Sequence, residues 1–368
     1  MSQTNTLPIS YNGSHCYNIE IRDSFEEFYN SLCELSLEKK RLCIVADSNV
    51  DAIYGAAFFQ MLKAKGCPDV YRFTFPAGEE NKTLSVIEDM YESLIQWQFD
   101  RSDVLIALGG GVTGDMTGYT AATYLRGIRF IQVPTSLLSM VDSSIGGKTG
   151  VDFRGYKNMV GAFHQPSLVY VNINVLKTLD KRQYASGMGE ILKHGLIKNA
   201  PYFYWLKNSE KEIQLLEQDA LLQMIFESQM IKKQVVEADP KEKGERAYLN
   251  FGHTIGHAIE KASDFTLLHG ECVALGMISA AYISFLRGDL SKDDLILIEK
   301  VIASYGLPTR LKEIDNEKII EICQHDKKKD GAVIKFILLK KLGQCYMTAD
   351  VTGQEISNAL DYIKEGFI

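Results

Sequence analysis

The stretch DVLIALGGGVTGDMTG, residues 103–118, is the most informative part of the sequence, because an apolar run typical of a buried strand leads into a glycine-rich turn and the start of a helix. Gly109, Gly111 and Gly114 in this stretch fit the pattern G-x-G-x-x-G. Glycines at such a turn let the backbone approach a pyrophosphate, and the helix N-terminus supplies free N–H groups. The stretch therefore predicts an α/β domain with a turn suited to a dinucleotide, although tight strand–helix turns also favour glycine for packing alone.

The turn departs from the usual dinucleotide pattern in two ways. It lies near the third predicted strand instead of the first, and no acidic residue follows about 20 positions later to hold a ribose. Other strand ends offer polar groups instead: Asp47 and Asn49 in VADSN, and Glu79 and Lys82 in FPAGEENKT. Open α/β sheets bind ligands at the carboxyl ends of their strands, so these residues are candidate cofactor contacts. The alternative is that they only form turns and cap helices.

The two halves of the chain have different hydrophobic patterns. In the first half, short apolar runs alternate with helical periodicity, which predicts a mostly parallel sheet covered on both faces. The predicted strands are 41–48, 70–75, 103–111, 128–134 and 168–173, and the predicted helices between them are 51–66 and 83–99. After about residue 180, helical patterns cover 211–239, 252–263, 271–288, 293–306 and 317–326, followed by a short hairpin at 332–339 and 343–350. We expect a Rossmann-like α/β domain over 1–179 and a mainly helical domain over 180–368.

Composition narrows the class of protein. A chain of 368 residues with 46% hydrophobic and 24% charged residues is typical of a globular protein with two domains. The net charge of -7 argues against a nucleic-acid surface, but it allows a local basic pocket for a small anion. The seven cysteines contain no C-x-x-C pair, which favours reduced thiols in a cytoplasmic protein. The sequence shows no signal-peptide pattern and no uninterrupted apolar run of about 18 residues, so we expect no membrane partner.

Two histidines stand four residues apart in NFGHTIGHAIE, residues 250–260. Helical spacing predicts that His253 and His257 project from one face, which by itself favours the pair as two metal ligands. Residue 254 is Thr, where a metalloprotease of the H-E-x-x-H type carries its general base, so that chemistry is excluded. A catalytic zinc needs a third protein ligand, for which Glu190 and His269 are candidates. The alternative for each histidine is a hydrogen-bonded imidazole in the core.

Several segments in unbroken order resemble the 3-dehydroquinate synthase family. The first four are GGGVTGDMTGYTAATYLRG (109–127), VPTSLLSMVDSSIGGKTGVD (133–152), KNMVGAFHQP (157–166) and GMGEILKHG (187–195). The next three are EADPKEKGERAYLNFGHTIGHAIE (237–260), LHGECVALGM (268–277) and DKKKDG (326–331). The resemblance covers most of the chain, and it implies that family's two-domain fold, NAD and a divalent metal, Zn²⁺ or Co²⁺.

The resemblance also implies roles for individual residues. The metal ligands are Glu190, His253 and His269, so that His257 becomes a substrate-site residue which does not touch the metal. The other implied substrate-site residues are Asp142, Lys148, Asn158, Lys193, Lys232, Arg246, Asn250 and Lys328, with Arg126 reaching across a homodimer interface. The implied NAD contacts are Asp47, Asn49, Glu79, Lys82, Gly109, Gly110, Gly111, Val112, Asp115, Thr135, Ser136, Lys148, Lys157 and Thr178. The chain departs mildly from the family, with His194 where many relatives have Tyr and Ser136 where many have Thr.

The implied activity is the second step of the shikimate pathway to aromatic amino acids. The sugar phosphate 3-deoxy-D-arabino-heptulosonate 7-phosphate is oxidised transiently by NAD, loses phosphate, is reduced again and closes by an intramolecular aldol step to 3-dehydroquinate. NAD is regenerated, so the enzyme is a lyase. The substrate carries a carboxylate and a phosphate, which suits the four cations Lys148, Lys193, Lys232 and Arg246.

Three other functions compete with this interpretation. A metal-dependent polyol dehydrogenase would use NAD and metal, but it would have no need of four substrate-side cations. A cyclase that makes 2-deoxy-scyllo-inosose from glucose 6-phosphate acts on a substrate without a carboxylate, and DSSIGGKTGVD together with Asp115 favours the dehydroquinate enzyme. A catalytically inactive NAD sensor would not need the intact set Glu190, His253 and His269.

Overall fold

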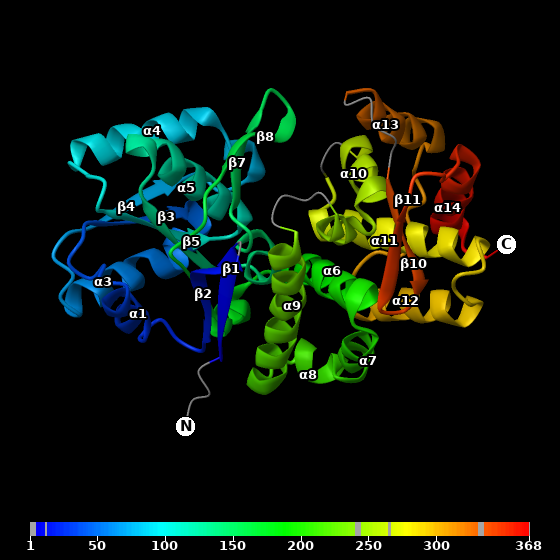
Figure 1. The fold of residues 1–368 in the computed structure, drawn as a ribbon, viewed down its shortest axis with the longest axis horizontal. Helices are drawn as coiled ribbons and strands as arrows, with labels where there is room; N and C mark the ends of the chain where they lie inside the picture. Colours follow the sequence, from blue (N-terminus) through cyan, green and yellow to red (C-terminus); the bar gives the residue numbers. More distant parts are fainter. Residues whose placement is uncertain (1–4, 12, 240–243, 264–265, 330–334, 368) are drawn as a thin grey trace. The chain divides into compact units, whose positions relative to one another are not determined.

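The structure is a computed structural model that describes residues 5–11, 13–239, 244–263, 266–329 and 335–367, with the side chains of 324–329 left out. The chain forms two compact units, Met1–Leu179 and Asp180–Ile368. In Figure 1 the first unit runs in colour from blue to green and the second from green to red.

The first unit is built on a seven-stranded sheet in the order β1-β2-β9-β6-β5-β3-β4. Its strands are β1 (Asn5–Tyr11), β2 (Ser14–Arg22), β3 (Leu42–Asp47), β4 (Val70–Phe75), β5 (Val104–Gly109), β6 (Arg129–Pro134) and β9 (Leu168–Asn172). All neighbouring pairs described in this sheet are parallel except β1 with β2. The predicted α/β fold with a mostly parallel sheet is confirmed.

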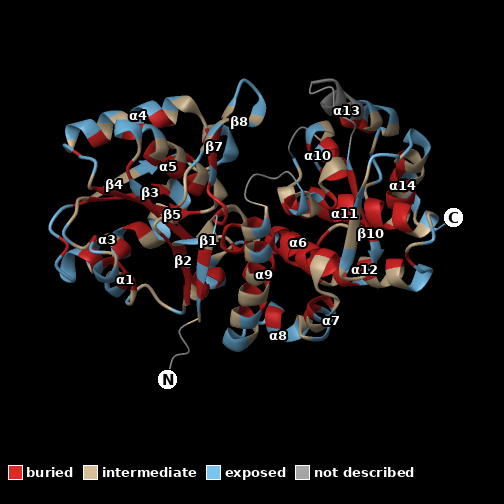
Figure 2. Ribbon diagram, viewed as in Figure 1, coloured by how far each residue is buried: buried red, intermediate tan, exposed pale blue. Residues whose placement is uncertain are grey.

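Helices cover both faces of this sheet (Figure 1). They are α1 (Phe28–Glu34), α2 (Ser48–Val50), α3 (Ala56–Ala64), α4 (Leu84–Gln96) and α5 (Gly111–Thr123). Because strand side chains alternate between faces, Leu42 and Ile44 of β3 pack with α1 and α3, whereas Cys43 and Val45 pack with α4 and α5. The central strands β3, β5, β6 and β9 are buried on both faces, as their colour in Figure 2 shows, and this explains why the sequence reads as continuous apolar runs there.

The strand order creates a switch point between β3 and β5. The chain runs from β3 outward to β4, then returns to the other side of β3 with β5 and continues to β6. The helices that follow β3 and β5 therefore pack on opposite faces of the sheet, α3 with one core cluster and α5 with the other. Open α/β sheets bind ligands at such a point. Asp47 ends β3 and Gly109 ends β5.

Two hairpins in the first unit do not follow from the sequence patterns. One is β1–β2, which joins the sheet through β2 and β9. The other is a separate two-stranded sheet of β7 (Lys148–Phe153) and β8 (Tyr156–Phe163). Short helical turns complete the unit: η1 (Asp51–Gly55), η2 (Glu79–Asn81), η3 (Tyr124–Arg126), η4 (Ser139–Ser143) and η5 (Ile173–Thr178).

The second unit is mainly helical, as predicted. Its elements are α6 (Lys181–Lys198), α7 (Ala200–Asn208), α8 (Glu210–Gln214), α9 (Gln218–Ala238), η6 (Glu245–Asn250), α10 (His253–Ala262), α11 (His269–Leu286), α12 (Lys292–Ser304), α13 (Asn316–Lys329), β10 (Phe336–Lys341), β11 (Gln344–Thr348) and α14 (Gly353–Glu365). The continuous helix predicted over 211–239 is divided into α8 and α9, because Leu216 between them has a left-handed φ of 56°.

Helices α6 and α11 form the centre of the second unit and are buried almost all round (Figure 2). Among the described residues, α11 is the one helix long and apolar enough to cross a membrane. However, 78% of its apolar window is buried inside the protein. Such burial is what a core helix of a folded domain requires, and it explains why α11 is apolar on every side.

Candidate active site

The candidate NAD contacts gather at one edge of the first unit's sheet. They follow the carboxyl ends of five parallel strands: Asp47 after β3, Lys82 after β4, Gly109–Gly111 after β5, Thr135 and Ser136 after β6, and Thr178 at the end of η5, after β9. Because these strands are parallel, their carboxyl ends share one edge. The topology thus collects these polar residues from segments that lie up to about 130 positions apart.

The glycine turn leaves the first turn of α5 open to a ligand. Gly110 precedes the helix, and no side chain within the described chain caps its first N–H groups. A Cβ on Gly111 would lie 3.1 Å from Ser143 Oγ, and one on Gly110 would lie 3.5 Å from Ser136 Oγ. The turn therefore has bare backbone where a pyrophosphate needs close approach to N–H groups, and these residues fit NAD.

Asp47 holds the neighbouring turn of this edge. Its Oδ1 accepts hydrogen bonds from the backbone N–H groups of Asn49 (2.9 Å) and Val50 (3.1 Å), and its Oδ2 accepts one from Thr113 of α5 at 3.4 Å. The capping role that the sequence left open is therefore real, and it coexists with a position at the switch point. Tyr54, which the motifs did not single out, shares a 2.5 Å hydrogen bond with Thr178.

A buried lysine joins candidate NAD and substrate residues. Lys82 is 3% exposed, and its Nζ donates to Asp115 Oδ2 at 2.7 Å and to Asn158 Oδ1 at 2.6 Å. Burial raises the pKa of Asp115 despite Lys82, whereas Asp115 and Glu79 raise the pKa of Lys82 despite burial. The short contact and the second acceptor favour the ion pair with Lys82 charged.

The β7–β8 hairpin is fixed to this lysine through a residue that the motifs missed. Asp152 accepts from the backbone N–H of Asn158 at 2.8 Å, and its own N–H donates to the backbone oxygen of Lys82 at 2.8 Å. Asn158 has a left-handed φ of 55°, a conformation that Asn tolerates better than most residues. Asp152 could have been suspected only from its place as the last residue of the GGKTGVD motif.

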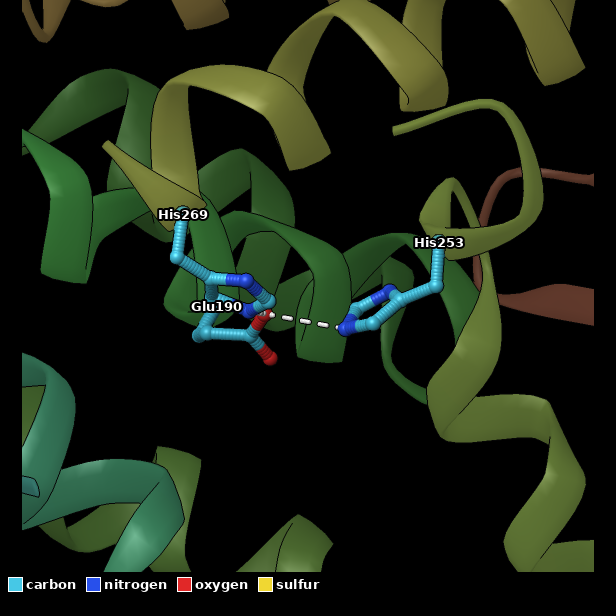
Figure 3. A group of neighbouring side chains, drawn as sticks. All are labelled: Glu190, His253 and His269. Atoms are coloured by element: carbon cyan, nitrogen blue, oxygen red, sulfur yellow. Dashed lines mark ion pairs between the residues drawn. The ribbon is translucent and has the colours of Figure 1, made fainter. Parts of the chain in front are cut away.

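The candidate metal ligands meet in the second unit. Glu190 lies on α6, His253 begins α10 and His269 begins α11. In Figure 3 both imidazole rings point toward the carboxylate of Glu190. Nε2 of His253 and Nε2 of His269 each lie 3.4 Å from Glu190 Oε1, and the three donor atoms lie within 4.8 Å of one another.

This donor set fits a zinc or cobalt ion. Tetrahedral zinc with Zn–N and Zn–O bonds of 2.0–2.2 Å places neighbouring donor atoms about 3.3–3.5 Å apart. The two measured separations of 3.4 Å match that spacing. One carboxylate and two imidazoles is also a ligand set of catalytic zinc sites, which keep an open position for water or substrate.

The electrostatics of the second unit favour ionised Glu190 and neutral His253. Burial alone would raise the pKa of Glu190, but Lys193 and His253 outweigh it and hold that pKa well below its usual range. Burial and the charge of Lys193 lower the pKa of His253. Lys193, itself 1% exposed, donates to Glu190 Oε2 from one turn further along α6. A carboxylate and a neutral imidazole are the forms that bind a metal.

His257 occupies a second group of donors. Its ring is exposed and lies 5.1 Å, centroid to centroid, from that of His253. Among the described residues, the candidate metal groups that contain these histidines pair His253 with Glu190 and His269, and His257 with Glu260 and His269. The pairing of His253 with His257, which spacing alone favours, does not occur in either group.

Three candidate substrate cations are buried in the second unit. Lys193 of α6, Lys232 of α9 and Arg246 of η6 are each no more than 5% exposed, and α6, α9 and η6 pack against one another. Asn250 ends η6 and is exposed. Buried cations need anionic partners, and Lys193 has one in Glu190.

The remaining candidates lie elsewhere. Lys148 is exposed at the start of β7, Asp142 is half-buried in η4, and Arg126 is exposed in η3. Lys157 Nζ lies 3.8 Å from Glu79 Oε1. Val112, the second residue of α5, is partly buried against the core. Lys328 lies in α13, but its side chain is outside the described residues.

Comparison with known proteins identifies the family. Residues 72–186 match the family described as 3-dehydroquinate synthase N-terminal, and residues 187–329 match 3-dehydroquinate synthase C-terminal. The chain is 43% identical over 326 residues to a 3-dehydroquinate synthase of Acetivibrio thermocellus, covering 88% of this chain and 90% of that protein.

Two solved structures of related cyclases have a similar fold. A 2-epi-5-epi-valiolone synthase from Streptomyces hygroscopicus subsp. jinggangensis, with NAD⁺ and Zn²⁺ bound, has a TM-score of 0.89 at 26% identity, covering 98% of this chain and 99% of that one. A 2-deoxy-scyllo-inosose synthase complexed with carbaglucose-6-phosphate, NAD⁺ and Co²⁺ has a TM-score of 0.87 at 27% identity, covering 98% and 100%. From the matches in sequence and in structure it follows that the chain belongs to the 3-dehydroquinate synthase family.

Proposed function

We propose that the protein converts 3-deoxy-D-arabino-heptulosonate 7-phosphate into 3-dehydroquinate and phosphate, the second step of the shikimate pathway. One observation carries the proposal. A fully buried carboxylate, Glu190, receives two imidazole nitrogens at 3.4 Å, in a chain 43% identical to a 3-dehydroquinate synthase over nine-tenths of that enzyme's length. The enzyme is a phosphate-eliminating carbon–oxygen lyase that uses NAD without consuming it.

Glu190, His253 and His269 hold the divalent cation, Zn²⁺ or Co²⁺. When bound, the cation supplies Lewis acidity that makes a substrate hydroxyl easier to deprotonate. Glu190 contributes the negative charge, and His253 and His269 contribute neutral nitrogen donors. Lys193 donates to the other oxygen of Glu190 and so fixes the direction in which the carboxylate faces.

The edge of the first unit's sheet holds NAD, which supplies reversible hydride acceptance when bound. The backbone N–H groups of Gly110 to Val112 bind the pyrophosphate. Asp47 and Asn49 lie at the switch point, and Glu79, Lys82, Asp115, Lys157, Thr135, Ser136 and Thr178 complete the contacts. For most of them the support is their position after the carboxyl ends of β3, β4 and β6 or at the end of η5. Asp115 of α5 and Lys157 of β8 are supported by their ion pairs with Lys82 and Glu79.

Cationic side chains bind the two anionic groups of the substrate. In the second unit these are Lys193, Lys232, Arg246 and, from α13, Lys328, with Asn250 and His257 as polar contacts. In the first unit we assign substrate contacts to Asp142, Lys148 and Asn158. Each charge-assisted hydrogen bond to phosphate or carboxylate contributes roughly 1.5–3 kcal/mol. His257 is exposed beside the metal donors, where it hydrogen-bonds a substrate oxygen.

The protein acts as a homodimer in the cytoplasm. Arg126 and its neighbour Leu125 both have left-handed φ values, 69° and 50°, which cost roughly 1–2 kcal/mol for each residue. Such a conformation persists where function requires it, and the exposed Arg126 is suited to the substrate site of a partner protomer. The cytoplasmic location rests on the family's biosynthetic role and on the absence of a C-x-x-C pair from the sequence.

A phosphate-release assay tests the function. We expect phosphate release from the heptulosonate phosphate with NAD and Zn²⁺, no net formation of NADH, and loss of the reaction when a chelator removes the metal. Glucose 6-phosphate as substrate distinguishes a cyclase of the 2-deoxy-scyllo-inosose type, and accumulating NADH would identify a net dehydrogenase.

The variant His253→Ala tests the metal site. It should abolish phosphate release while NAD still binds, because His253 lies outside the unit that carries the glycine turn. The matched control is His15→Ala, which removes an exposed imidazole whose partner is Asn18. Phosphate release by the His253→Ala protein after metal removal would contradict the assignment.

A further inference from the structure

Three consecutive residues at the start of α11 contact three successive turns of α6. His269 approaches Glu190 at 3.4 Å, the backbone N–H of Gly270 donates to Ser186 Oγ at 3.0 Å, and Glu271 binds Arg182. We call these contacts between Arg182, Ser186 and Glu190 of α6 and residues 269–271 of α11 the α6–α11 seam. Each helix contributes one candidate metal ligand to the seam, Glu190 from α6 and His269 from α11.

The pair at the far end of the seam is a double hydrogen bond. Nε and Nη2 of Arg182 donate to Oε1 and Oε2 of Glu271, both at 2.7 Å. Nη2 also donates to the backbone oxygen of Thr266 at 3.0 Å, and Glu271 Oε2 accepts from the backbone N–H of Leu268 at 2.7 Å. The pair therefore ties α6 both to the first turn of α11 and to the loop residues just before it.

The middle of the seam leaves no room for adjustment by translation. A Cβ on Gly270 would lie 1.9 Å from the backbone oxygen of Ser186, and one on Gly189 would lie 2.9 Å from the backbone oxygen of Gly270. The two backbones are thus already in contact. The freedom that remains to the start of α11 is rotation about this contact, which would swing His269 relative to Glu190.

We propose that Arg182 and Glu271 are positioning residues that fix this rotation and thereby set the affinity of the metal centre. Glu271, which Arg182 holds, lies one residue beyond the Gly270 contact, and His269 lies one residue before it, so that fixing Glu271 restrains His269. Neither residue reaches the metal donors directly in the contacts described above. The inference rests on the proposed metal ligands Glu190, His253 and His269.

A second arginine–glutamate pair offers a matched control. Arg287, at the opposite end of α11, donates from Nε and Nη2 to Glu355 at 2.6 and 3.1 Å. Glu355 is the third residue of α14, as Glu271 is of α11. Each glutamate accepts a hydrogen bond from the backbone N–H of the residue just before its helix, Thr352 or Leu268. The control pair is the same interaction on α14, which carries no proposed metal ligand.

The experiment compares metal binding by the parent, Arg182→Met, Glu271→Gln, Arg287→Met and His253→Ala in the full chain. Each protein is stripped with a chelator, titrated with Co²⁺ by visible absorption, and titrated with Zn²⁺ against a chromophoric chelator. Loss of a residue that orients a ligand typically weakens metal binding about 10- to 100-fold. We expect that loss, with changed Co²⁺ absorption bands, in Arg182→Met and Glu271→Gln but not in Arg287→Met, although thermal unfolding shifts in all three.

Each other outcome is decisive. Unchanged metal affinity in a folded Arg182→Met protein overturns the inference, and so does an equal loss in Arg287→Met, because the effect would then follow general stability. If Arg182→Met does not fold, the metal affinity of Glu271→Gln decides, because Gln keeps an acceptor for the Leu268 N–H. If neither variant folds, the metal affinity of Arg182→Lys, which keeps the positive charge but loses the double hydrogen bond, decides instead. If the parent binds no metal in a His253-dependent way, the proposed metal site itself fails and the inference falls with it.

Discussion

Replacing Lys193 by Met should make the stability of the second unit depend on bound metal. Lys193 is 1% exposed, and its ammonium contacts Glu190, which is fully buried. Removing one partner of a buried ion pair costs roughly 3–5 kcal/mol, because the other charge stays buried without compensation. For a domain of 150–250 residues each kcal/mol shifts the Tm by about 2–4 °C, so we expect metal-free Lys193→Met to melt about 6–20 °C below the parent.

Bound metal should reverse most of that loss. A divalent cation at Glu190, His253 and His269 replaces the positive charge that the substitution removes. A ligand that binds only the folded state also stabilises it, by an amount that grows with the logarithm of the ligand concentration divided by Kd. The assay is differential scanning calorimetry of parent and Lys193→Met, each with chelator and with excess Zn²⁺. We expect the gap between the two proteins to be large with chelator and small with zinc.

The control for this experiment is Lys198→Met on the same helix. Lys198 forms an exposed ion pair with Glu245 at 3.3 Å, which contributes roughly 0–1 kcal/mol. It should melt close to the parent in both conditions. The reasoning is wrong if Lys193→Met melts like the parent without metal, or if zinc leaves the gap between them unchanged.

The remaining predictions concern a glycine and an ion pair of the second unit. Gly252 precedes α10 with φ 79°, and a Cβ there would lie 2.7 Å from the backbone N of Met277, whereas Gly288 has φ 78° and open space around it. Gly288→Ala should therefore lower the free energy of unfolding only by the cost of the left-handed backbone, about 1–2 kcal/mol. Gly252→Ala should lower it by about 1–3 kcal/mol more because of the clash. Urea unfolding measures both losses, and equal losses would show that the structure relaxes to remove the clash. Arg287 lowers the pKa of Glu355 below its ordinary 4.5, so the stabilisation is present above that pH and is lost as the pH falls through the lower folded value. The Tm difference between the parent and Arg287→Met should shrink on acidification from about pH 6 to about pH 3, a range that spans the ordinary pKa of a glutamate. A constant Tm difference would show that the ion pair is not the source of the stabilisation.

Local patterns predicted the sheet because its signals are local. The runs 41–48, 103–111, 128–134 and 168–173 contain continuous apolar stretches, as buried parallel strands require. The run 70–75, which forms the edge strand β4, is interrupted by Arg72 and Thr74 and is only partly buried. The hairpin β7–β8 was missed because β8 is largely exposed and lacks clear alternation. Helix α6 was missed for the opposite reason. It is buried almost throughout and yet contains Glu190, Lys193 and His194, so it has no polar face to give a helical period.

The arrangement of the histidines could not follow from spacing. His253 and His257 share a helix face, as their separation predicts, but the direction of the metal donors depends on where α6 and α11 cross α10. His269 reaches Glu190 only because glycines at 189 and 270 let α6 and α11 approach closely. That approach is a tertiary event between segments about 80 residues apart. Sequence spacing therefore identifies the residue types, and packing decides which of them meet.

The position of β2 has a consequence for the order in which the protein is made. Residues Asn18 to Arg22 pair in parallel with Leu168 to Asn172, so β2 has its place in the sheet beside a strand that the ribosome synthesises about 150 residues later. While the chain is being translated, the β1–β2 hairpin must wait, with one hydrogen-bonding edge uncovered, until β9 has emerged. The nascent chain therefore exposes an unpaired strand edge, which can pair with other chains, for most of the first unit's synthesis. Chaperone binding early in translation should protect this edge from aggregation.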